Sequence, residues 1–355
     1  MSPRFFLRFQ FLMALLISGS GPIRAQVALI GPPGDTVRVF DDLFGTDEPL
    51  QMTLTFDVKQ FQRTRQKEEY QPAAMTLPAG DSGELLFPVR IRARGNYRRD
   101  ECSTPPFWLN IRYSGLMEGE LTDIRRMKVV TRCRSGSQYD YYVLREYLTY
   151  RLYNLVTPYS FRTRLVRLTT VDLGRDGKTE SQWAILIEPE ELMARRLNGR
   201  IVDSDNLSVQ TVNFGIMDRL AMYQYMIGNG DFSITGQHNK KILAVNNGPV
   251  SGFVPIPYDF DYCGLVNTHY AVPNEALPIR TVRERYYQGP CRSETAYQLV
   301  IDEFLSLREE MNALILSFPH LDDEEKLDMI SYLQTFFNDA AKEDFIQDNL
   351  RRTCL

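Results

Sequence analysis

Residues 228–262 have the sequence GNGDFSITGQHNKKILAVNNGPVSGFVPIPYDFDY, which contains the strongest structural signals of the chain. Before it, apolar residues between 214 and 225 recur at helical spacing and predict a helix that ends at Gly228. The turn Asn246-Asn-Gly248 between two apolar runs predicts a β-hairpin. Because a hairpin returns the chain to where it began, we expect the two acidic loops that flank it to lie side by side.

The polar side chains of these two loops suit the transfer of a phosphoryl group. That chemistry needs an aspartate near the acceptor hydroxyl, and an asparagine and an aspartate on Mg²⁺. Asp231 is the candidate for the first role, while Asn239 and Asp259 offer the hard oxygen ligands of the second. The alternative is that the residues around Asp231 only end a helix and that Asp259 only caps a local turn.

The composition predicts a folded protein with one large bilobal domain or two domains. The chain has 355 residues, of which 43% are hydrophobic and 12% aromatic, enough for a sizeable core. The net charge is -4, and basic residues are interspersed with acidic ones. The sequence therefore provides no reason to expect nucleic acid as a partner.

The first 25 residues have the features of a secretory signal. Arg4 and Arg8 form a basic start, residues 9–17 form an apolar run too short to span a bilayer, and Ala25 stands at a position suited to cleavage. No other run approaches the ~20 apolar residues of a transmembrane helix. We expect an exported mature protein, periplasmic, on the cell surface or secreted, with no transmembrane segment. The alternative is an uncleaved N-terminal anchor.

The predicted exported part of the chain contains five cysteines: Cys102, Cys133, Cys263, Cys291 and Cys354. Export permits disulfides, and an odd number leaves at least one thiol free or intermolecular. We predict a bridge between Cys102 and Cys133, because both flank the same strand-rich region. The absence of CxxC spacing and the presence of only three histidines argue against a zinc site.

The first half of the chain is predicted to be rich in β-structure and the second half to be mostly helical. Residues 61–82 are charged and contain proline, which predicts a surface loop. A helix is predicted over 141–155, where leucines at 144, 148, 152 and 155 share one face. Strands are predicted at 50–58, 85–93, 107–113, 127–133, 161–173 and 183–187.

Several motifs follow one another in the order of a known family. They are Phe87–Asn96, Met127–Val130, Tyr142–Leu148, Trp183–Glu188, Asn229–Asp231, His238–Asn239 and Pro257–Asp261. Over residues 85–265 this ordered set resembles the CotH-like secreted kinases, relatives of the spore-coat kinase CotH, and more distantly the HipA-type kinases. The resemblance implies an α+β, bilobal, atypical protein-kinase-like fold. It implies a β-rich N-terminal lobe at 26–189, a mostly helical C-terminal lobe at 190–355, and a site in the cleft between them.

The resemblance also implies roles for the residues of the two acidic loops. Asp231 would be the catalytic aspartate, and Asn239 and Asp259 would be metal ligands. Asp261 would be a further acidic residue that supports metal binding. We interpret His238 as a hydrogen-bonded brace of the loop rather than as a base.

A second set of residues would bind the nucleotide. Lys128 would contact its phosphates with Glu146 as a helix partner, and Glu188 would lie at the adenine-side hinge. The turn that contains Arg94 and Asn96 would cover the phosphates. The implied reaction moves the γ-phosphoryl group of ATP, bound with Mg²⁺ or Mn²⁺, to a hydroxyl of a protein or surface polymer outside the cytoplasm.

The chain departs from the kinase pattern in two places. Asp231 and Asn239 are eight residues apart, whereas ordinary kinases place this pair about five apart. The sequence also lacks a G-x-G-x-x-G loop. Two alternatives therefore remain. One is a catalytically inactive pseudokinase that acts as a secreted binding or scaffold module, and the other is a hydrolase with paired carboxylates, such as a glycosidase.

Overall fold

The computed structural model describes residues 43–355, apart from 79–82, 112–125, 203–211, 234–237 and 247–249. These residues all belong to one compact unit of the chain. The predicted secretory signal at 1–25 lies outside the described residues.

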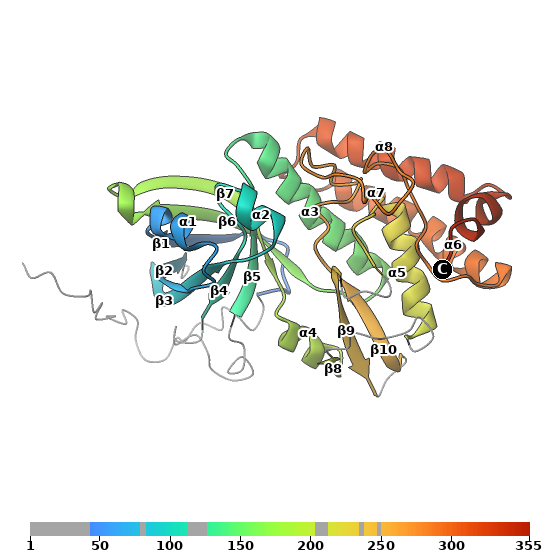
Figure 1. The fold of residues 1–355 in the computed structure, drawn as a ribbon, viewed down its shortest axis with the longest axis horizontal. Coiled ribbons are helices and arrows are strands. Elements are labelled where there is room, and N and C mark those ends of the chain that lie inside the picture. Colours follow the sequence, from blue (N-terminus) through green and yellow to red (C-terminus); the bar gives the residue numbers. More distant parts are fainter. Residues whose placement is uncertain (1–42, 79–82, 112–125, 203–211, 234–237, 247–249) are drawn as a thin grey trace, which may run out of the picture. The chain divides into compact units, whose positions relative to one another are not determined.

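Seven strands of the described chain close into a β-barrel (Figure 1). Around the barrel their order is β1-β2-β3-β4-β5-β7-β6, and β6 then pairs with β1. The pair β1–β6 is parallel, and the other neighbouring pairs are antiparallel. The strands are β1 (Leu50–Phe56), β2 (Gln71–Pro78), β3 (Glu84–Ala93), β4 (Phe107–Asn110), β5 (Arg126–Thr131), β6 (Thr163–Asp172) and β7 (Lys178–Ile187).

This architecture confirms the α+β class but corrects the predicted bilobal, kinase-like fold, because the sheet is a closed, mixed barrel. Closure depends on β1, which pairs with β6 on one side and with β2 on the other. A closed sheet has no exposed edge whose backbone groups lack partners. The pairing that closes it joins strands far apart in the sequence, and the alternation of apolar residues within a strand does not reveal which strand is its neighbour.

The predicted surface loop at 61–82 is also wrong. Helix α1 (Val58–Thr64) begins there with Asp57, whose carboxylate accepts a hydrogen bond of 2.8 Å from the Gln60 N–H. The helix buries Phe61 against the barrel core. Strand β2 follows and buries Met75 and Leu77, so its apolar positions face inward despite the charged residues before it.

The other predicted elements of the first half are confirmed with shifted ends. The strands predicted at 85–93, 107–113, 127–133, 161–173 and 183–187 correspond to β3, β4, β5, β6 and β7, and residues 112 and 113 lie outside the described residues. The predicted helix at 141–155 is α3 (Ser137–Val156). A short helix that was not predicted, α2 (Tyr97–Glu101), follows the turn at Gly95, whose φ is +85°.

The rest of the described chain is mainly helical, as predicted. A three-stranded antiparallel sheet, in the order β10-β9-β8, accompanies the helices. These elements are α4 (Glu190–Arg196), β8 (Gly199–Val202), α5 (Phe214–Met226), β9 (Lys240–Val245), β10 (Gly252–Pro257), α6 (Glu294–Ser306), α7 (Arg308–Leu316) and α8 (Asp323–Ala340). Two short turns of 3₁₀ and π type complete the set, Leu173–Arg175 and Ile346–Arg351.

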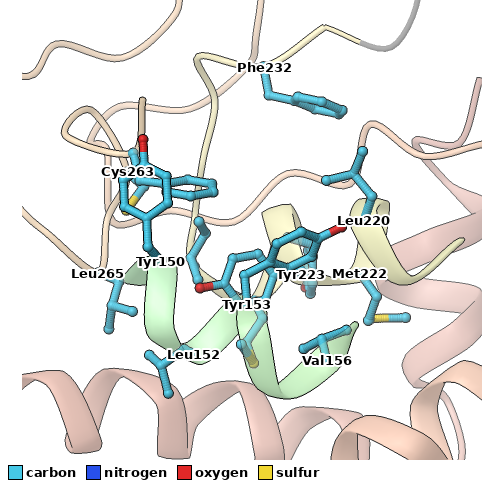
Figure 2. Close-up of a cluster of buried hydrophobic side chains, with 14 of the residues drawn as sticks. Tyr150, Leu152, Tyr153, Val156, Leu220, Met222, Tyr223, Phe232, Cys263 and Leu265 are labelled. Carbon is cyan, nitrogen blue, oxygen red and sulfur yellow. The ribbon is translucent and has the colours of Figure 1, made fainter. Parts of the chain in front are cut away.

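Two hydrophobic clusters form the core. One fills the barrel, and the other surrounds α3, which packs against β6, β7 and α7. In the second cluster Tyr153 of α3 meets Tyr223 of α5 with ring centroids 4.7 Å apart (Figure 2). Leu144, Leu148 and Leu152 are fully buried here. Helix α3 therefore lies between the barrel and the helical part of the chain (Figure 1).

Two disulfides are present among the described residues. The predicted bridge between Cys102 and Cys133 is confirmed, and Cys291 pairs with Cys354. Cys263 is a buried free thiol. Two disulfides are compatible with an exported protein. Among the helices described, none combines the length and apolar character needed to cross a membrane.

Candidate functional site

The hairpin brings the two acidic loops together, as predicted. Strands β9 and β10 pair with Pro257 opposite Lys240, and the Tyr258 N–H donates to the Asn239 carbonyl at 3.0 Å. The pairing thus continues one residue beyond the strands. Asn239 therefore lies directly beside the start of the loop that contains Asp259.

The end of helix α5 is tied to the same loop. The N–H groups of Gly264 and Leu265 donate to the carbonyls of Gly228 and Ile227, each at 3.0 Å. Gly228 has a φ of +65°, and a Cβ atom on it would lie 2.1 Å from the Tyr332 hydroxyl. Only glycine fits this close approach, which explains why the helix ends here.

Asp231 is held by three polar neighbours. His238 Nε2 lies 2.8 Å from its Oδ1, and the Asn239 amide donates at 2.9 Å to its Oδ2 and to its backbone carbonyl. Its own N–H donates to the Asn229 side chain at 3.0 Å. The carboxylate therefore has a defined direction, and His238 braces it, in agreement with our interpretation of that residue.

Asp259 lies on a constrained backbone with an unengaged side chain. Its φ is +68°, a left-handed value that costs energy in a residue other than glycine. Its N–H donates to the Tyr150 hydroxyl at 2.8 Å, and the next residue, Phe260, is fully buried against Tyr150. Among the described residues, no hydrogen-bond or ion-pair partner is found for the Asp259 carboxylate.

Asp261 belongs to a buried ionic group that also contains Glu146 and Arg98. Arg98 Nη1 lies 3.5 Å from Glu146 Oε2 and 3.5 Å from Asp261 Oδ2. The Tyr270 hydroxyl donates to Asp261 at 3.1 Å. All three charged side chains are buried. Arg98 was missed from the sequence, because the charged run of α2 offers no signal that separates it from Arg99.

The carboxylates of the two loops influence one another. Burial raises the pKa of Asp261 to about 6, and the charge of Asp259 adds to this rise while Arg98 opposes it. Burial raises the pKa of Glu146 well above its usual value, with Asp261 as the next contribution. Burial also raises the pKa of Asp231, which His238 opposes and Asp259 reinforces. The site therefore holds more negative charge than Arg98 neutralises.

Lys128 does not form the predicted pair with Glu146. Its ammonium lies 3.1 Å from Glu190 Oε1 and 4.2 Å from the centre of the Tyr258 ring. Because α4 begins directly after β7, Glu190 reaches Lys128 across the β5–β7 pair, while Arg98 takes Glu146. Burial lowers the pKa of Lys128 to about 8, although Glu190 opposes that effect.

The remaining predicted nucleotide residues have different surroundings. Glu188 is fully buried, and its carboxylate binds Arg162 and Arg196, each at 2.8 Å. Arg94 lies over the Trp108 ring, 5.4 Å from its centroid, and its charge acts on Glu146, Tyr150 and Lys128. Asn96 is exposed at the start of α2.

Together, the structure gathers most of the predicted residues around the two acidic loops. Asp231 and Asn239 are in direct contact, and Asp259, Asp261 and Glu146 interact through their charges. Lys128 meets the same loop through Tyr258. Glu188 is bound by two arginines, and Asn96 is at the surface.

The donor groups of the site suit Mg²⁺ bound together with a nucleotide. Within the described ranges, no three His, Cys, Asp or Glu side chains converge to form a complete metal site. Mg²⁺ is usually held by one or two carboxylates together with water and substrate phosphates, rather than by an all-protein cage. The Asn239 amide nitrogen donates to Asp231, and no partner for its amide oxygen or for the Asp259 carboxylate is found among the described residues, so both can bind a cation. We therefore regard Asn239 and Asp259 as a fitting partial ligand set.

Comparison with known proteins adds no assignment to these residues. The sequence matches no model of a known protein family and no curated protein. The chemistry of the site is therefore the basis for assigning a function.

Proposed function

We propose that this protein is an exported phosphotransferase that moves the γ-phosphoryl group of ATP to a hydroxyl of a protein or surface polymer. The single observation that supports this most is the unengaged Asp259 carboxylate, held on left-handed backbone within a group of acidic side chains. A carboxylate that is held in a fixed position and has no partner among the described residues is available to bind a cation. The ordered motifs shared with CotH-like secreted kinases also support the proposal, now on a closed β-barrel architecture.

In the proposed reaction Asp231 orients the acceptor hydroxyl and accepts its proton. Its fixed carboxylate, braced by His238 and Asn239, meets the first requirement of such a base, which is geometry. A raised pKa of Asp231 moves it toward the range in which a carboxylate accepts a proton effectively.

Asn239 and Asp259 would hold a divalent cation through their side-chain oxygens. When bound, such an ion would neutralise charge on the phosphate oxygens. Lys128 and Arg94 would attract the phosphates, since both cations lie beside the same loop and influence each other. Lys128 and Arg94 would then act on the phosphates of the nucleotide, while Asp231 acts on the acceptor hydroxyl.

The proposal is tested by incubating the disulfide-intact protein with labelled ATP and Mg²⁺ or Mn²⁺. We expect transfer to the protein itself or to a model acceptor. Asp231→Asn should lower the rate by roughly 10²–10⁴-fold, as expected for loss of a general base. Asp176→Asn is the matched control, because Asp176 is exposed and also has left-handed backbone. Absence of transfer by the wild type would contradict the enzyme, and equal transfer by Asp231→Asn would remove Asp231 from its role.

A second candidate is a nucleotide-binding protein without catalysis. It is favoured by one observation, the ion pair of Lys128 with Glu190, which engages the lysine predicted for the phosphates. In that case Mg-ATP should raise the melting temperature of the wild type while no phosphate is transferred. A lack of both effects would contradict this candidate as well.

A further inference from the structure

Arg98 occupies a position surrounded by oxygen atoms. Its guanidinium lies 3.5 Å from a carboxylate oxygen of Glu146 and 3.5 Å from one of Asp261, and it donates to the Thr131 carbonyl. The Tyr270 hydroxyl adjoins the same Asp261 carboxylate at 3.1 Å. Two carboxylates and a carbonyl are the hard oxygen ligands that a divalent cation would take.

The other groups around Arg98 show that it only partly satisfies this site. The side chain is 8% exposed, and Glu146 is 1% exposed. Glu146 Oε1 is buried and has no hydrogen-bond partner among the described residues. The guanidinium thus supplies a positive charge to Glu146 but leaves one of its buried carboxylate oxygens without a hydrogen bond. A position of this kind favours a positive charge, which burial of the carboxylate requires.

The surroundings of the carboxylates show which of them already have a positive partner. Four carboxylates interact here, those of Glu146, Asp231, Asp259 and Asp261. Arg98 and Arg94 are the arginines whose charges act on Glu146. Of the four, Glu146 and Asp261 lie next to Arg98, whereas no cationic partner is found for Asp259 among the described residues, so the cation that remains to be supplied belongs at Asp259.

We infer that Arg98 is a built-in counter-ion that takes the place of a second divalent cation, so that the protein side chains hold one such ion, at Asn239 and Asp259. This inference rests on the proposed function. Arg98 is then a positioning residue, since it holds Asp261 and Glu146 and touches neither nucleotide nor acceptor. It also assigns Asp261 to Arg98 rather than to the metal.

The inference is tested by counting bound Mn²⁺ in the nucleotide-free, disulfide-intact protein, by titration followed with electron paramagnetic resonance. We expect one ion per chain in the wild type and two in Arg98→Met, because the released oxygen atoms then form a second site. Two neighbouring ions should also broaden the signal by spin–spin coupling. A merely structural role of Arg98 would not add a site.

Two further variants separate charge from shape. Arg98→Lys keeps a positive charge and should hold one ion, whereas Arg99→Met changes a half-buried neighbour on the same helix and should also hold one. Two ions in the wild type, or one in folded Arg98→Met, would overturn the inference and leave the proposed function intact. No ion in the nucleotide-free wild type would overturn the inference but not the proposed function, in which the ion is bound together with the nucleotide. If Arg98→Met does not fold, Arg98→Gln, which also removes the positive charge, is counted in its place and should again hold two ions.

Discussion

At the scale of single residues, the predicted metal ligands share an unusual backbone. Asn239 has a φ of +55° and Asp259 a φ of +68°. Non-glycine residues in this region cost roughly 1–3 kcal/mol when the surrounding structure forces them there. Asparagine and aspartate tolerate it best. The hairpin therefore holds two oxygen-bearing side chains in fixed positions, where glycine would relieve the backbone but supply no ligand.

Replacing Asp259 by glycine separates these two contributions. We expect Asp259→Gly to change the free energy of unfolding by no more than about 1 kcal/mol, since relief of strain offsets the greater freedom of the unfolded chain. We also expect it to abolish the rise in melting temperature caused by Mg²⁺. Asp176→Gly, at an exposed residue with a φ of +49°, is the control and should keep that rise. A full Mg²⁺ effect in Asp259→Gly would remove this residue from the site.

Burial of Lys128 predicts a stability that depends on pH. Its pKa is lowered from 10.5 to about 8. Below pH 8 the lysine is charged in both states and its burial is costly. Between 8 and 10.5 the folded state has released its proton while the unfolded state still binds one, so the stability of the wild type rises with pH.

The variant Lys128→Met lacks this buried charge. The free energy of unfolding of the variant, minus that of the wild type, should therefore be larger at pH 7 than at pH 10.5. At about 1.4 kcal/mol per pKa unit, the difference between the two pH values should be about 3 kcal/mol. Urea unfolding at both pH values measures it. Lys178→Met, at an exposed position of β7, should show almost no change with pH. A flat profile for Lys128→Met would show that the lysine keeps its usual pKa in the folded state.

At the scale of elements, helix α3 supports the loop that contains Asp259. Tyr150 accepts the Asp259 N–H and packs against Phe260, with ring centroids 4.7 Å apart. Tyr153, one turn further along the helix, lies in the same cluster of buried side chains (Figure 2). Its hydroxyl is buried and has no partner among the described residues. The two tyrosines thus differ in what their hydroxyl groups do.

This difference predicts opposite effects of removing each hydroxyl. Tyr150→Phe leaves the Asp259 N–H without its acceptor and should destabilise the protein by about 1–3 kcal/mol. Tyr153→Phe removes an unsatisfied buried group and should be neutral or stabilising. Urea unfolding of the two variants, side by side, provides the measurement. No loss of stability in Tyr150→Phe would indicate that the Tyr150 hydroxyl has no structural role.

At the scale of the whole described chain, the two disulfides stabilise different regions. Cys102 follows α2, which contains Arg98, and Cys133 follows β5, which contains Lys128. The Ser103 N–H also donates to the Cys133 carbonyl, at 2.9 Å. The first bridge therefore holds Arg98 near Glu146 and Asp261. The second bridge joins Cys291 to Cys354 in the C-terminal region.

Removing each bridge separately should affect the cation site differently. Their sequence separations of 31 and 63 residues predict a loss of about 4 kcal/mol for each, from the greater entropy of the unfolded chain. Only the double variant Cys102→Ser with Cys133→Ser should show a larger Mn²⁺-induced rise in melting temperature, because a loosened Arg98 leaves two carboxylates for the ion. The variant Cys291→Ser with Cys354→Ser is the control. Identical Mn²⁺ effects in both would disconnect the first bridge from the site.

The sequence by itself determined the features that local patterns encode. These are the β9–β10 hairpin, the end of α5 at Gly228, the helix α3 and the closeness of the two acidic loops. Turn residues and the spacing of apolar residues act over a few positions, so they are visible in one sequence. The Cys102–Cys133 pair was predicted because both residues flank one strand-rich region.

Only the tertiary structure decided the closure of the barrel, the position of β2, and the partners of Lys128, Glu146 and Glu188. Strand β1 pairs with β6, although strands β2 to β5 lie between them in the sequence. No local pattern specifies such a pairing. Arg98 and Arg99 are equivalent as letters in a charged run. What distinguishes them is burial among oxygen atoms from three separate segments, and burial is a property that the chain acquires only when those segments fold together.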